Sequence, residues 1–393
     1  MMTKTMTMLE RSRELQKEIV ELRRHIHAHP ELSYEEHQTS KLAAEKLKEL
    51  GYTVKTGIAK TGVIGDLGSG KTIGIRADMD GLPIQESNKT PYCSKNAGVM
   101  HACGHDAHVS CALATAKLLA SEKLPGRIRM IMQPAEENGD EEGVSGAQRM
   151  IEQGVMEGVS AVIGLHMDSG VPAGKVGIQA GPVMAAMDGF TITIRGKGGH
   201  GAYPDTCVDS VVIGAQIVSA LQTIISRRIS ALEPAVVTVG SFHSESKRGN
   251  VISETVELQG TIRTFNEETR QKIIHEVEQI CTISRAMGGN YEIDYEMGYP
   301  ATVNHPDITA VMRQVAVDLI GADNVIPVPL KTWAEDFSML AQAAPGAFMF
   351  LGGEIQGDRR SHHSPTFDLD ESGLYIGPAI LAETARRLLL AGQ

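Results

Sequence analysis

Four groups of acidic, histidine and cysteine residues come directly after apolar strands or at a helix start. This placement constrains the fold more than any other feature of the chain. The groups are Asp78 and Asp80 after 72–77, Cys103 and His105 before a helix at about 107–121, Glu136 and Glu137 after 127–133, and His166 after 160–165. Ligands of open α/β sheets bind at the carboxyl ends of the strands. One acidic pair alone would be compatible with a solvated turn, but four such groups predict an α/β fold with a site at one sheet edge.

The densest group is the segment His101-Ala102-Cys103-Gly104-His105-Asp106. If the segment is extended, Cys103 and His105 point to the same side, and Gly104 allows a tight backbone between them. Three interpretations remain open: a buried cysteine beside a helix cap, a cysteine nucleophile paired with a histidine, and a metal site with thiolate and imidazole ligands. Adjacent residues at a strand end point to opposite sides, so one of Glu136 and Glu137 would face a metal and the other the substrate.

Composition limits the class of protein. A chain of 393 residues fits about two domains, and its net charge of −11 argues against nucleic-acid and anionic-membrane partners. No apolar run approaches the roughly 20 residues of a membrane span, and the first eight residues lack a signal-peptide core. Five scattered cysteines indicate a reducing, cytoplasmic compartment.

The pattern of elements divides the chain. We expect helices at 9–29 and 35–50 and a hairpin of strands 62–67 and 72–77 before the polar groups, and a βα pattern again from about 300. Between them the order of elements is βαββαβ, with strands at 190–195, 236–242, 255–263 and 291–296 and helices at 209–228 and 267–287. This order predicts a ferredoxin-like α+β insert at 189–297 within a catalytic domain formed by 1–188 and 298–393.

Three other motifs carry less weight. Gly65, Gly70, Lys71 and Thr72 match the phosphate-loop pattern, but a strand rather than a helix follows the lysine, so we reject nucleotide binding there. Gly196, Gly198 and Gly201 match the dinucleotide fingerprint in the wrong architecture, although His200 at the tip of that loop stays of interest. Three histidines end the first helix, where a polar helix terminus is commoner than a metal site; they are His25, His27 and His29.

Six motifs, in order along the chain from about residue 20 to the C-terminus, resemble the dinuclear metal-dependent amidohydrolases of the aminoacylase/carboxypeptidase clan. The branch is that of hippurate hydrolases, N-acyl-amino-acid amidohydrolases and plant auxin-conjugate hydrolases. The motifs are Arg76-Ala77-Asp78-Met79-Asp80, His101-Ala102-Cys103-Gly104-His105-Asp106, Pro134-Ala135-Glu136-Glu137, Gly198-Gly199-His200, Ala334-Glu335-Asp336-Phe337 and His363-Ser364-Pro365.

The resemblance implies two divalent metal ions per chain, of zinc, manganese or cobalt. Cys103 would bridge the two ions, and the other metal ligands would be His105, Glu137, His166 and His363. We favour His363 over His362 because it directly precedes Ser364-Pro365. Glu136 would be the catalytic carboxylate, which takes a proton from the attacking water, so that a metal-bound hydroxide is the nucleophile, and gives that proton to the leaving amine. Asp80 would orient a ligand, and the role of Glu335 is left open.

The resemblance also implies that the 189–297 insert is a lid that joins two subunits in a homodimer. In that arrangement His200 from the partner's lid would stabilise the oxyanion, and Asn250 and Arg263 would contact the substrate carboxylate. A strand-face salt bridge is an equally good interpretation of Arg263.

The expected reaction is hydrolysis of an N-acyl amino acid to a carboxylic acid and a free amino acid. The alternatives are a metallo-carboxypeptidase or dipeptidase on the same scaffold, and a metal-dependent binding protein without turnover. The intact Glu136-Glu137 pair argues against the binding protein.

Overall fold

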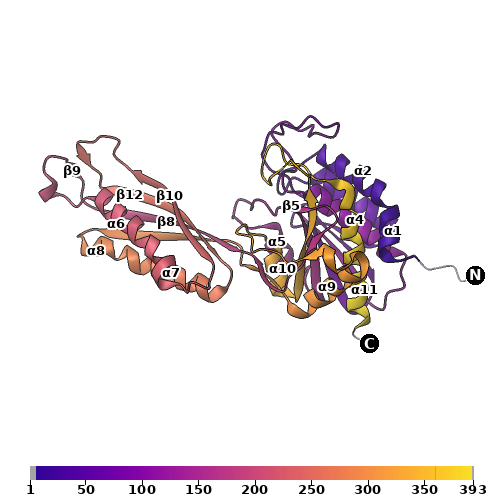
Figure 1. Cartoon of the computed structure of the whole chain (residues 1–393). Coiled ribbons are helices and arrows are strands. Elements are labelled where there is room, and N and C mark those ends of the chain that lie inside the picture. The colour runs from indigo at the N-terminus through magenta and orange to yellow at the C-terminus, as the bar shows by residue number, and fades with distance from the viewer. Residues whose placement is uncertain (1–5, 359, 392–393) are drawn as a thin grey trace, which may run out of the picture. The chain divides into compact units, whose positions relative to one another are not determined.

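The structure is a computed structural model that describes residues 6–358 and 360–391. The chain forms two compact units, and each has a hydrophobic core of its own (Figure 1). Unit 1 contains the chain up to Gly181, Val303–Pro329 and the chain from Asp336 onward. Unit 2 contains Pro182–Thr302 and Leu330–Glu335. Strand β8 begins at Ala186, ahead of the boundary that the sequence suggested at 188/189.

Unit 1 is built on a mixed eight-stranded sheet with the strand order β1-β2-β4-β3-β5-β16-β6-β15. Strands β3, β4, β5 and β16 run parallel, whereas β2 and β6 run antiparallel to their neighbours β4 and β16. The predicted α/β class is confirmed, and the sheet is mixed. The bounds are β1 Thr53–Ile58, β2 Gly62–Gly68, β3 Thr72–Asp78, β4 Arg127–Gln133, β5 Val159–Pro172, β6 Val176–Gly177, β15 Val325–Ile326 and β16 Gly346–Glu354.

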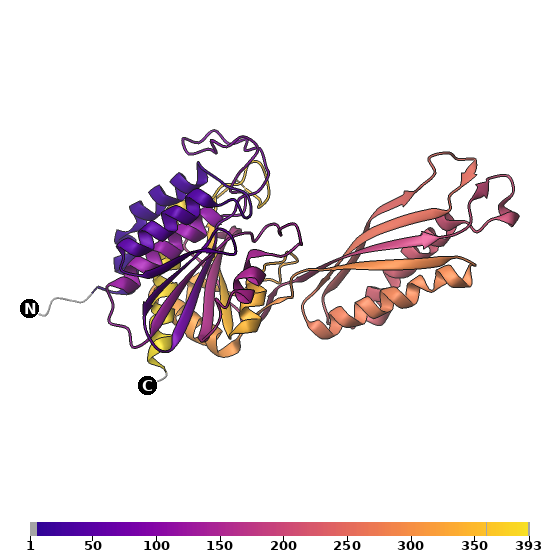
Figure 2. The same cartoon turned by 180° about the vertical axis from the view of Figure 1, so that it is seen from behind.

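Helices cover both faces of this sheet. On one face α4 and α11 pack against β3 and β5, and α1, α2, α3 and α9 join them; Figure 2 shows the N-terminal helices, in indigo, along one side of the strands. Helices α5 and α10 pack on each other and on β4, β5 and β16. The bounds are α1 Met8–Glu14, α2 Gln16–His27, α3 His37–Glu49, α4 His105–Ala120, α5 Gly146–Glu152, α9 Pro306–Ile320, α10 Phe337–Ala343 and α11 Ile376–Leu390.

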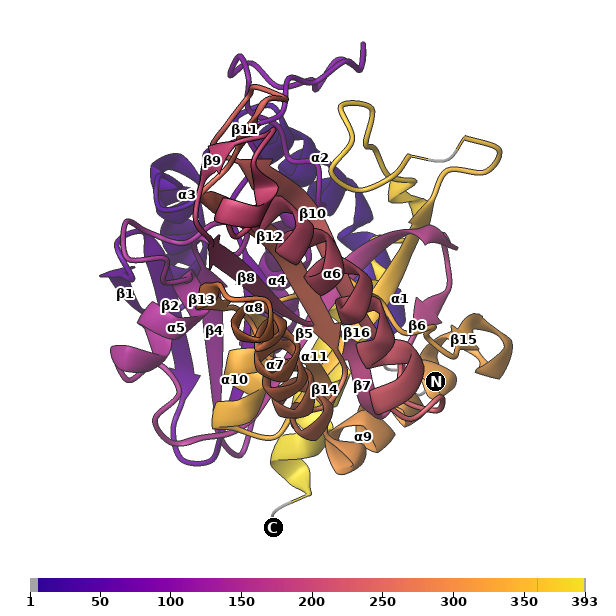
Figure 3. The ribbon, with the colours of Figure 1, turned by 90° about the vertical axis from the view of Figure 1, so that its left-hand side faces the viewer.

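Unit 2 has the predicted ferredoxin-like order of elements. Its four-stranded antiparallel sheet has the order β10-β12-β8-β13, and α6 and α7 pack side by side against it (Figure 3). The bounds are β8 Ala186–Arg195, α6 Ser210–Thr223, β10 Ala235–Ser244, β12 Thr255–Thr264, α7 Glu267–Cys281, α8 Ile283–Ala286 and β13 Asn290–Met297. A small ribbon pairs β9 (Gly199–His200) with β11 (Val251–Ile252). Two short strands, β7 (Gly181–Met184) and β14 (Thr302–Asn304), contain the points where the chain passes from one unit to the other.

Two local expectations were wrong. The strands at 62–68 and 72–78 do not form a hairpin, because β4 lies between them in the sheet and pairs with both. A tight turn fixes where two strands begin and end, but it does not decide which strands pair. The helix expected at 9–29 is interrupted at Leu15, which closes α1 and precedes α2.

One helical stretch, Ser210–Arg228, is long and apolar enough to cross a membrane by length and composition alone. This stretch differs from the expectation that no apolar run approaches the length of a membrane span. In unit 2 this stretch buries Ile213, Ile217 and Leu221 in the core beside the sheet, whereas only 33% of its apolar window is buried.

Candidate metal centre

The polar groups lie along the carboxyl-terminal edge of the parallel strands of unit 1. Asp78 is the last residue of β3 and pairs in register with Gln133, the last residue of β4. His166 lies inside β5, opposite Phe350 of β16. The expectation that His166 follows its strand was wrong, because β5 continues to Pro172. Parallel neighbours end at the same edge, so these separate segments deliver their side chains to one place.

Gly104 shapes the segment that carries Cys103 and His105. Its φ of +97° is disfavoured for residues with a Cβ, and a Cβ there would lie 3.0 Å from the Cβ of Met167. Gly104 caps α4, and His105 is the first residue of that helix. The segment is therefore not extended as expected, yet the Cys103 Sγ and the His105 ring both reach the same group of side chains.

Glu136 and Glu137 follow β4 through a bent turn in which Ala135 has a φ of +50°. Because of this turn, both side chains approach the same imidazole. The Glu136 Oε2 lies 4.0 Å and the Glu137 Oε1 3.8 Å from the His105 Nε2. The expectation that the two carboxylates point to opposite sides assumed an extended strand end and was wrong.

Two groups of possible metal ligands share the Cys103 thiol. One contains Cys103, His105 and His166, and the other contains Cys103, Glu137 and His363; within each group the ligand atoms lie within 4.8 Å of one another. The Cys103 Sγ lies 3.5 Å from the His166 Nε2, and the His363 Nε2 lies 3.3 Å from the Glu137 Oε1. Thiolate, imidazole and carboxylate together suit a zinc-type divalent ion.

Asp80 contacts two of the possible ligands, the His105 ring and the Glu137 backbone, and so fixes their orientation. Its Oδ1 lies 3.3 Å from the His105 Nδ1, and its Oδ2 accepts the Glu137 N–H at 2.9 Å and the Ser33 hydroxyl at 2.7 Å. Metal-binding histidines usually turn their second ring nitrogen to such a carboxylate. The role suggested for Asp80 from the sequence stays a prediction, with which this geometry is compatible.

The polar atoms at the centre of the group fit bound cations. Among the described residues, the His105 ring nitrogens, the Asp80 Oδ1 and the Glu137 Oε1 are buried without a hydrogen bond of good geometry. Burial alone would lower the pKa of His105, but the carboxylates of Asp78, Asp80 and Glu137 raise it to about 10. Burial lowers the pKa of His166 well below its usual range, which favours the neutral imidazole that a metal binds. Excess negative charge around unsatisfied ligand atoms is what two divalent ions would compensate.

The two adjacent histidines near the C-terminus have different surroundings. The His362 Nε2 accepts the Ser169 N–H at 3.3 Å, and its ring packs on Phe367. His363 has a φ of +56° and reaches Glu137 instead. Among the described residues, His363 and not His362 belongs to a group of possible ligands.

The sequence did not predict a chain of buried hydrogen bonds that lies behind the possible metal ligands. The Asp78 Oδ1 lies 2.6 Å from the His108 Nδ1, the His108 Nε2 accepts the Met167 N–H, and the Met167 carbonyl lies 2.6 Å from the His166 Nδ1. Arg76 binds the other Asp78 oxygen and also Asp336. The available signal was the position of His108, three residues after His105 on one helix.

The N-terminal histidines have structural surroundings. The His27 Nδ1 lies 2.7 Å from the Asp106 Oδ2, which also accepts from Arg23. Within the described part of the chain, His25, His27 and His29 belong to no group of possible metal ligands. This is compatible with the polar helix end that the sequence favoured.

The three residues expected to contact substrate lie in unit 2. His200 and Asn250 are exposed on the β9–β11 ribbon, where the Gly201 N–H donates to the Asn250 carbonyl at 2.8 Å. Arg263 is half-buried in β12. Asp188 pairs with Arg270 at 2.5 Å and its charge also acts on Arg263, so both interpretations of Arg263 stay open.

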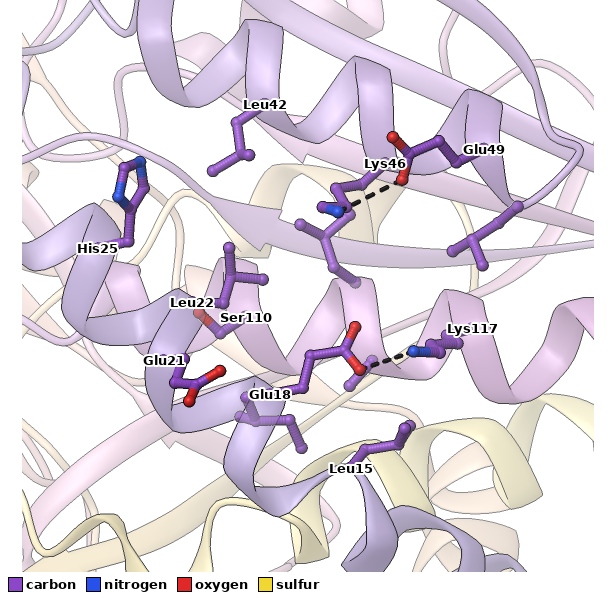
Figure 4. A pocket seen from close by; sticks show the side chains of 14 residues that line it. Leu15, Glu18, Glu21, Leu22, His25, Leu42, Lys46, Glu49, Ser110 and Lys117 are labelled. Atoms are coloured by element: carbon purple, nitrogen blue, oxygen red, sulfur yellow. Dashed lines mark hydrogen bonds and ion pairs between the residues drawn. The ribbon is translucent and has the colours of Figure 1, made fainter.

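A separate cavity of about 400 Å³ opens between α2, α3 and α4 (Figure 4). Leucine side chains line it, and two ion pairs, Lys46–Glu49 and Lys117–Glu18, stand at its rim. None of the predicted site residues lines this cavity.

Comparison with known proteins agrees with this geometry. Residues 74–387 match the family described as peptidase family M20/M25/M40. The chain is 42% identical over 375 residues to thermostable carboxypeptidase 1 of Saccharolobus solfataricus, covering 93% of this chain and 94% of the relative. It is 39% identical over 381 residues to N-acetyl-L-cysteine deacetylase of Bacillus subtilis, covering 95% and 89%.

A solved structure from Bacillus subtilis, described as a dinuclear metal binding peptidase from the M20 family, superposes with a TM-score of 0.84. It shares 32% identity and covers 96% of this chain and 99% of its own. Together with the two groups of ligands around Cys103, these likenesses support two divalent metals. The chain therefore belongs to the M20 peptidase family and is a metal-dependent amidohydrolase.

Proposed function

We propose that the protein hydrolyses the amide bond of N-acyl amino acids and releases a carboxylic acid and a free amino acid. The observation that carries the proposal is the position of Glu136. This carboxylate is 7% exposed, lies 4.0 Å from the His105 Nε2 and precedes the ligand Glu137. Glu136 lies outside the two groups that share Cys103, although it belongs to two other groups of possible ligands, one with His105 and Glu137 and one with Glu335 and Asp336. We assign it to proton transfer because a carboxylate beside the metal ligands can accept the proton of an attacking water.

Bound at the two groups that share Cys103, divalent ions would supply Lewis-acid chemistry, which lowers the pKa of a water molecule and polarises the amide carbonyl. Glu136 accepts the proton of the attacking water and then donates it to the nitrogen of the leaving amine. Asp80 fixes the orientation of His105 and the backbone of Glu137 during these steps. Zinc, manganese and cobalt all suit this set of ligands.

We further infer that unit 2 supplies substrate contacts. His200 would stabilise the oxyanion that develops on the carbonyl oxygen. Arg263 would bind the substrate carboxylate with its two-pronged guanidinium, and Asn250 would assist. The exposure of His200 and Asn250 on one ribbon supports this inference.

We also infer a homodimer formed through unit 2. Strand β10 is an edge of the four-stranded sheet, and it exposes Val236 and Phe242. Helix α6 exposes Val211 and Val212. An unpaired edge next to apolar side chains favours pairing with a second copy. Light scattering should give twice the chain mass, and a monomer at micromolar concentration would contradict the inference.

The direct test is amine release from N-acetyl, N-benzoyl and indolylacetyl amino acids and from free dipeptides. The protein is stripped with chelator and refilled with zinc, manganese or cobalt. Metal-dependent release from the acylated compounds is expected. Release from dipeptides alone would favour the peptidase alternative, which the 42% identity to a carboxypeptidase also supports. With two ions bound, no release from any compound would identify a binding protein.

The role of Glu136 gives a sharper test. Glu136→Gln should lower kcat by about 10²–10⁴-fold, because general acid–base catalysis contributes on that order. The variant should still bind two ions, because each group that shares Cys103 keeps all three of its ligands; loss of an ion would show that Glu136 is itself a ligand. Glu141→Ala, on the exposed loop that follows, serves as the control. Unchanged hydrolysis in Glu136→Gln would show that another group moves the proton.

A further inference from the structure

The turn that carries Glu136 has an unfavourable backbone conformation. Ala135 has a φ of +50°, a region where the Cβ crowds the backbone and which residues other than glycine seldom occupy. Such a conformation persists only where the surroundings determine it. Both peptide groups of Ala135 are in fact bound: its N–H donates to the Glu36 Oε1 at 2.8 Å, and its carbonyl accepts the Gly146 N–H at 2.9 Å.

Glu36 is fully buried, and its carboxylate joins three segments of the chain. Besides Ala135, the Oε1 accepts the Tyr34 N–H at 3.0 Å, and the Oε2 accepts the Thr61 hydroxyl at 2.5 Å. Glu36 is also the first capping residue of α3, and its own carbonyl accepts the Ser40 N–H at 2.8 Å. The Glu36 carboxylate is therefore fixed at the start of α3, and it accepts hydrogen bonds from Tyr34, Thr61 and Ala135.

The same segment also reaches the residue after Glu136. The Ser33 hydroxyl donates to the Asp80 Oδ2, and that oxygen accepts the Glu137 N–H. The 33–36 segment thus fixes the peptide N–H groups on both sides of Glu136, one directly and one through Asp80. Burial and the nearby Asp80 raise the pKa of Glu36 to about 7, so this carboxylate is an unfavourable group to bury for packing alone.

We propose that Glu36 is a positioning residue for the reaction: by holding the Ala135 N–H, it keeps the left-handed turn that aims the Glu136 carboxylate at the metal centre. The proposal rests on the role proposed above for Glu136. The carboxylate of Glu36 binds Tyr34, Thr61 and Ala135 and none of the proposed metal ligands, so its effect passes through the backbone of Ala135.

The test compares two substitutions at one position. Glu36→Ala removes the acceptor of the Ala135 N–H, and kcat should fall about 10–100-fold, as for other residues that support a site from behind. KM should change less than about threefold, and both ions should remain bound, because the ligand side chains keep their partners. Glu36→Gln keeps one carbonyl oxygen for the Tyr34 and Ala135 N–H groups and can donate to Thr61, so it should restore most of the lost kcat.

A second measurement does not depend on turnover. Hydrogen exchange of the 134–137 backbone should be faster in Glu36→Ala than in the wild type and in Glu36→Gln. Thr61→Val is the matched control, because it removes a donor to the Glu36 Oε2 and leaves the Ala135 contact in place. It should lower stability without lowering kcat. If Glu36→Ala does not fold, Glu36→Asp replaces it, since the shorter side chain withdraws the carboxylate by one methylene.

The outcomes separate this proposal from the proposed function. If Glu136→Gln is impaired but Glu36→Ala keeps wild-type kcat and slow exchange, the positioning role is wrong and the proposed function stands. If Glu36→Ala and Thr61→Val lower kcat equally, Glu36 is only a structural residue. If Glu136→Gln is unimpaired, another group moves the proton and the positioning role of Glu36 fails with it, whereas the proposed function itself fails only if no N-acyl amino acid is hydrolysed with two ions bound.

Discussion

At the scale of single residues, the difference between His362 and His363 comes from one backbone angle. His363 has a φ of +56°, and its N–H donates to the Ala102 carbonyl at 2.8 Å, next to Cys103. This bond ties the loop to the segment that carries the thiol and directs the ring toward Glu137. The ring of His362 packs among His166 and Phe367 instead.

His363→Ala should therefore reduce the bound metal from two ions toward one per chain and lower kcat by at least about 100-fold, because a direct ligand is lost. Elemental analysis of the purified variant measures the metal. His362→Ala is the control and should keep two ions. The reverse result, with metal lost only in His362→Ala, would exchange the assignments.

The ligands could be predicted because they occur in short motifs, whereas the residues that hold them could not. We could identify Cys103, His105 and Glu137 by their residue types and by the apolar strands beside them. Ser33 and Glu36 lie about a hundred positions before the glutamates that they support. A half-buried serine such as Ser33 or a buried glutamate such as Glu36 carries no periodic signal, and its role depends on which segments the fold brings together.

At the scale of elements, the sequence indicated the strands by their apolar runs, and β4 has the predicted bounds of 127–133. The neighbours of each strand in the sheet could not be predicted in the same way. The supposed hairpin failed because β4, more than fifty residues later, lies between its two strands. Pairing depends on contacts distant in sequence, which local patterns do not contain.

The start of α4 gives a prediction about an element. Gly104→Ala should lower the free energy of unfolding by about 1–3 kcal/mol, because it combines a left-handed φ with crowding against Met167. Urea denaturation measures the change, and metal affinity should fall with it.

Gly70→Ala is the matched control for this substitution. Gly70 has a similar φ of +92°, but a Cβ there meets nothing within 4 Å. Gly70→Ala should lower the free energy of unfolding by about 1 kcal/mol, because only the left-handed backbone conformation disfavours alanine there. Equal losses in the two variants would show that the contact with Met167 does not matter.

At the scale of the whole molecule, all the predicted metal ligands belong to unit 1, and unit 2 has a separate core. Bound ions should therefore stabilise one part of the chain. By mass action, free metal at a hundred times its Kd adds about 2.7 kcal/mol to the folded state. Unit 2 contains none of these ligands and should gain nothing directly.

Calorimetry should compare the metal-free protein with the protein refilled with metal. The Tm of one unfolding transition should rise by several degrees with metal, and the Tm of a second should not change. Ile213→Ala, in the core of unit 2, should lower only the second transition and so identify it. A single transition that moves as a whole with metal would mean that the two units unfold together.

The order of strands in unit 1 also has a consequence for synthesis on the ribosome. Strand β16, made from residues 346–354, lies between β5 and β6 in the finished sheet. The neighbours of β16 are thus translated well before it, and His363 is later still. Unit 2 occupies a nearly continuous stretch of chain and is complete earlier, apart from Leu330–Glu335. A nascent chain can therefore fold unit 2 first. The sheet of unit 1 and its full set of metal ligands are complete only after β16 and His363 have been synthesised.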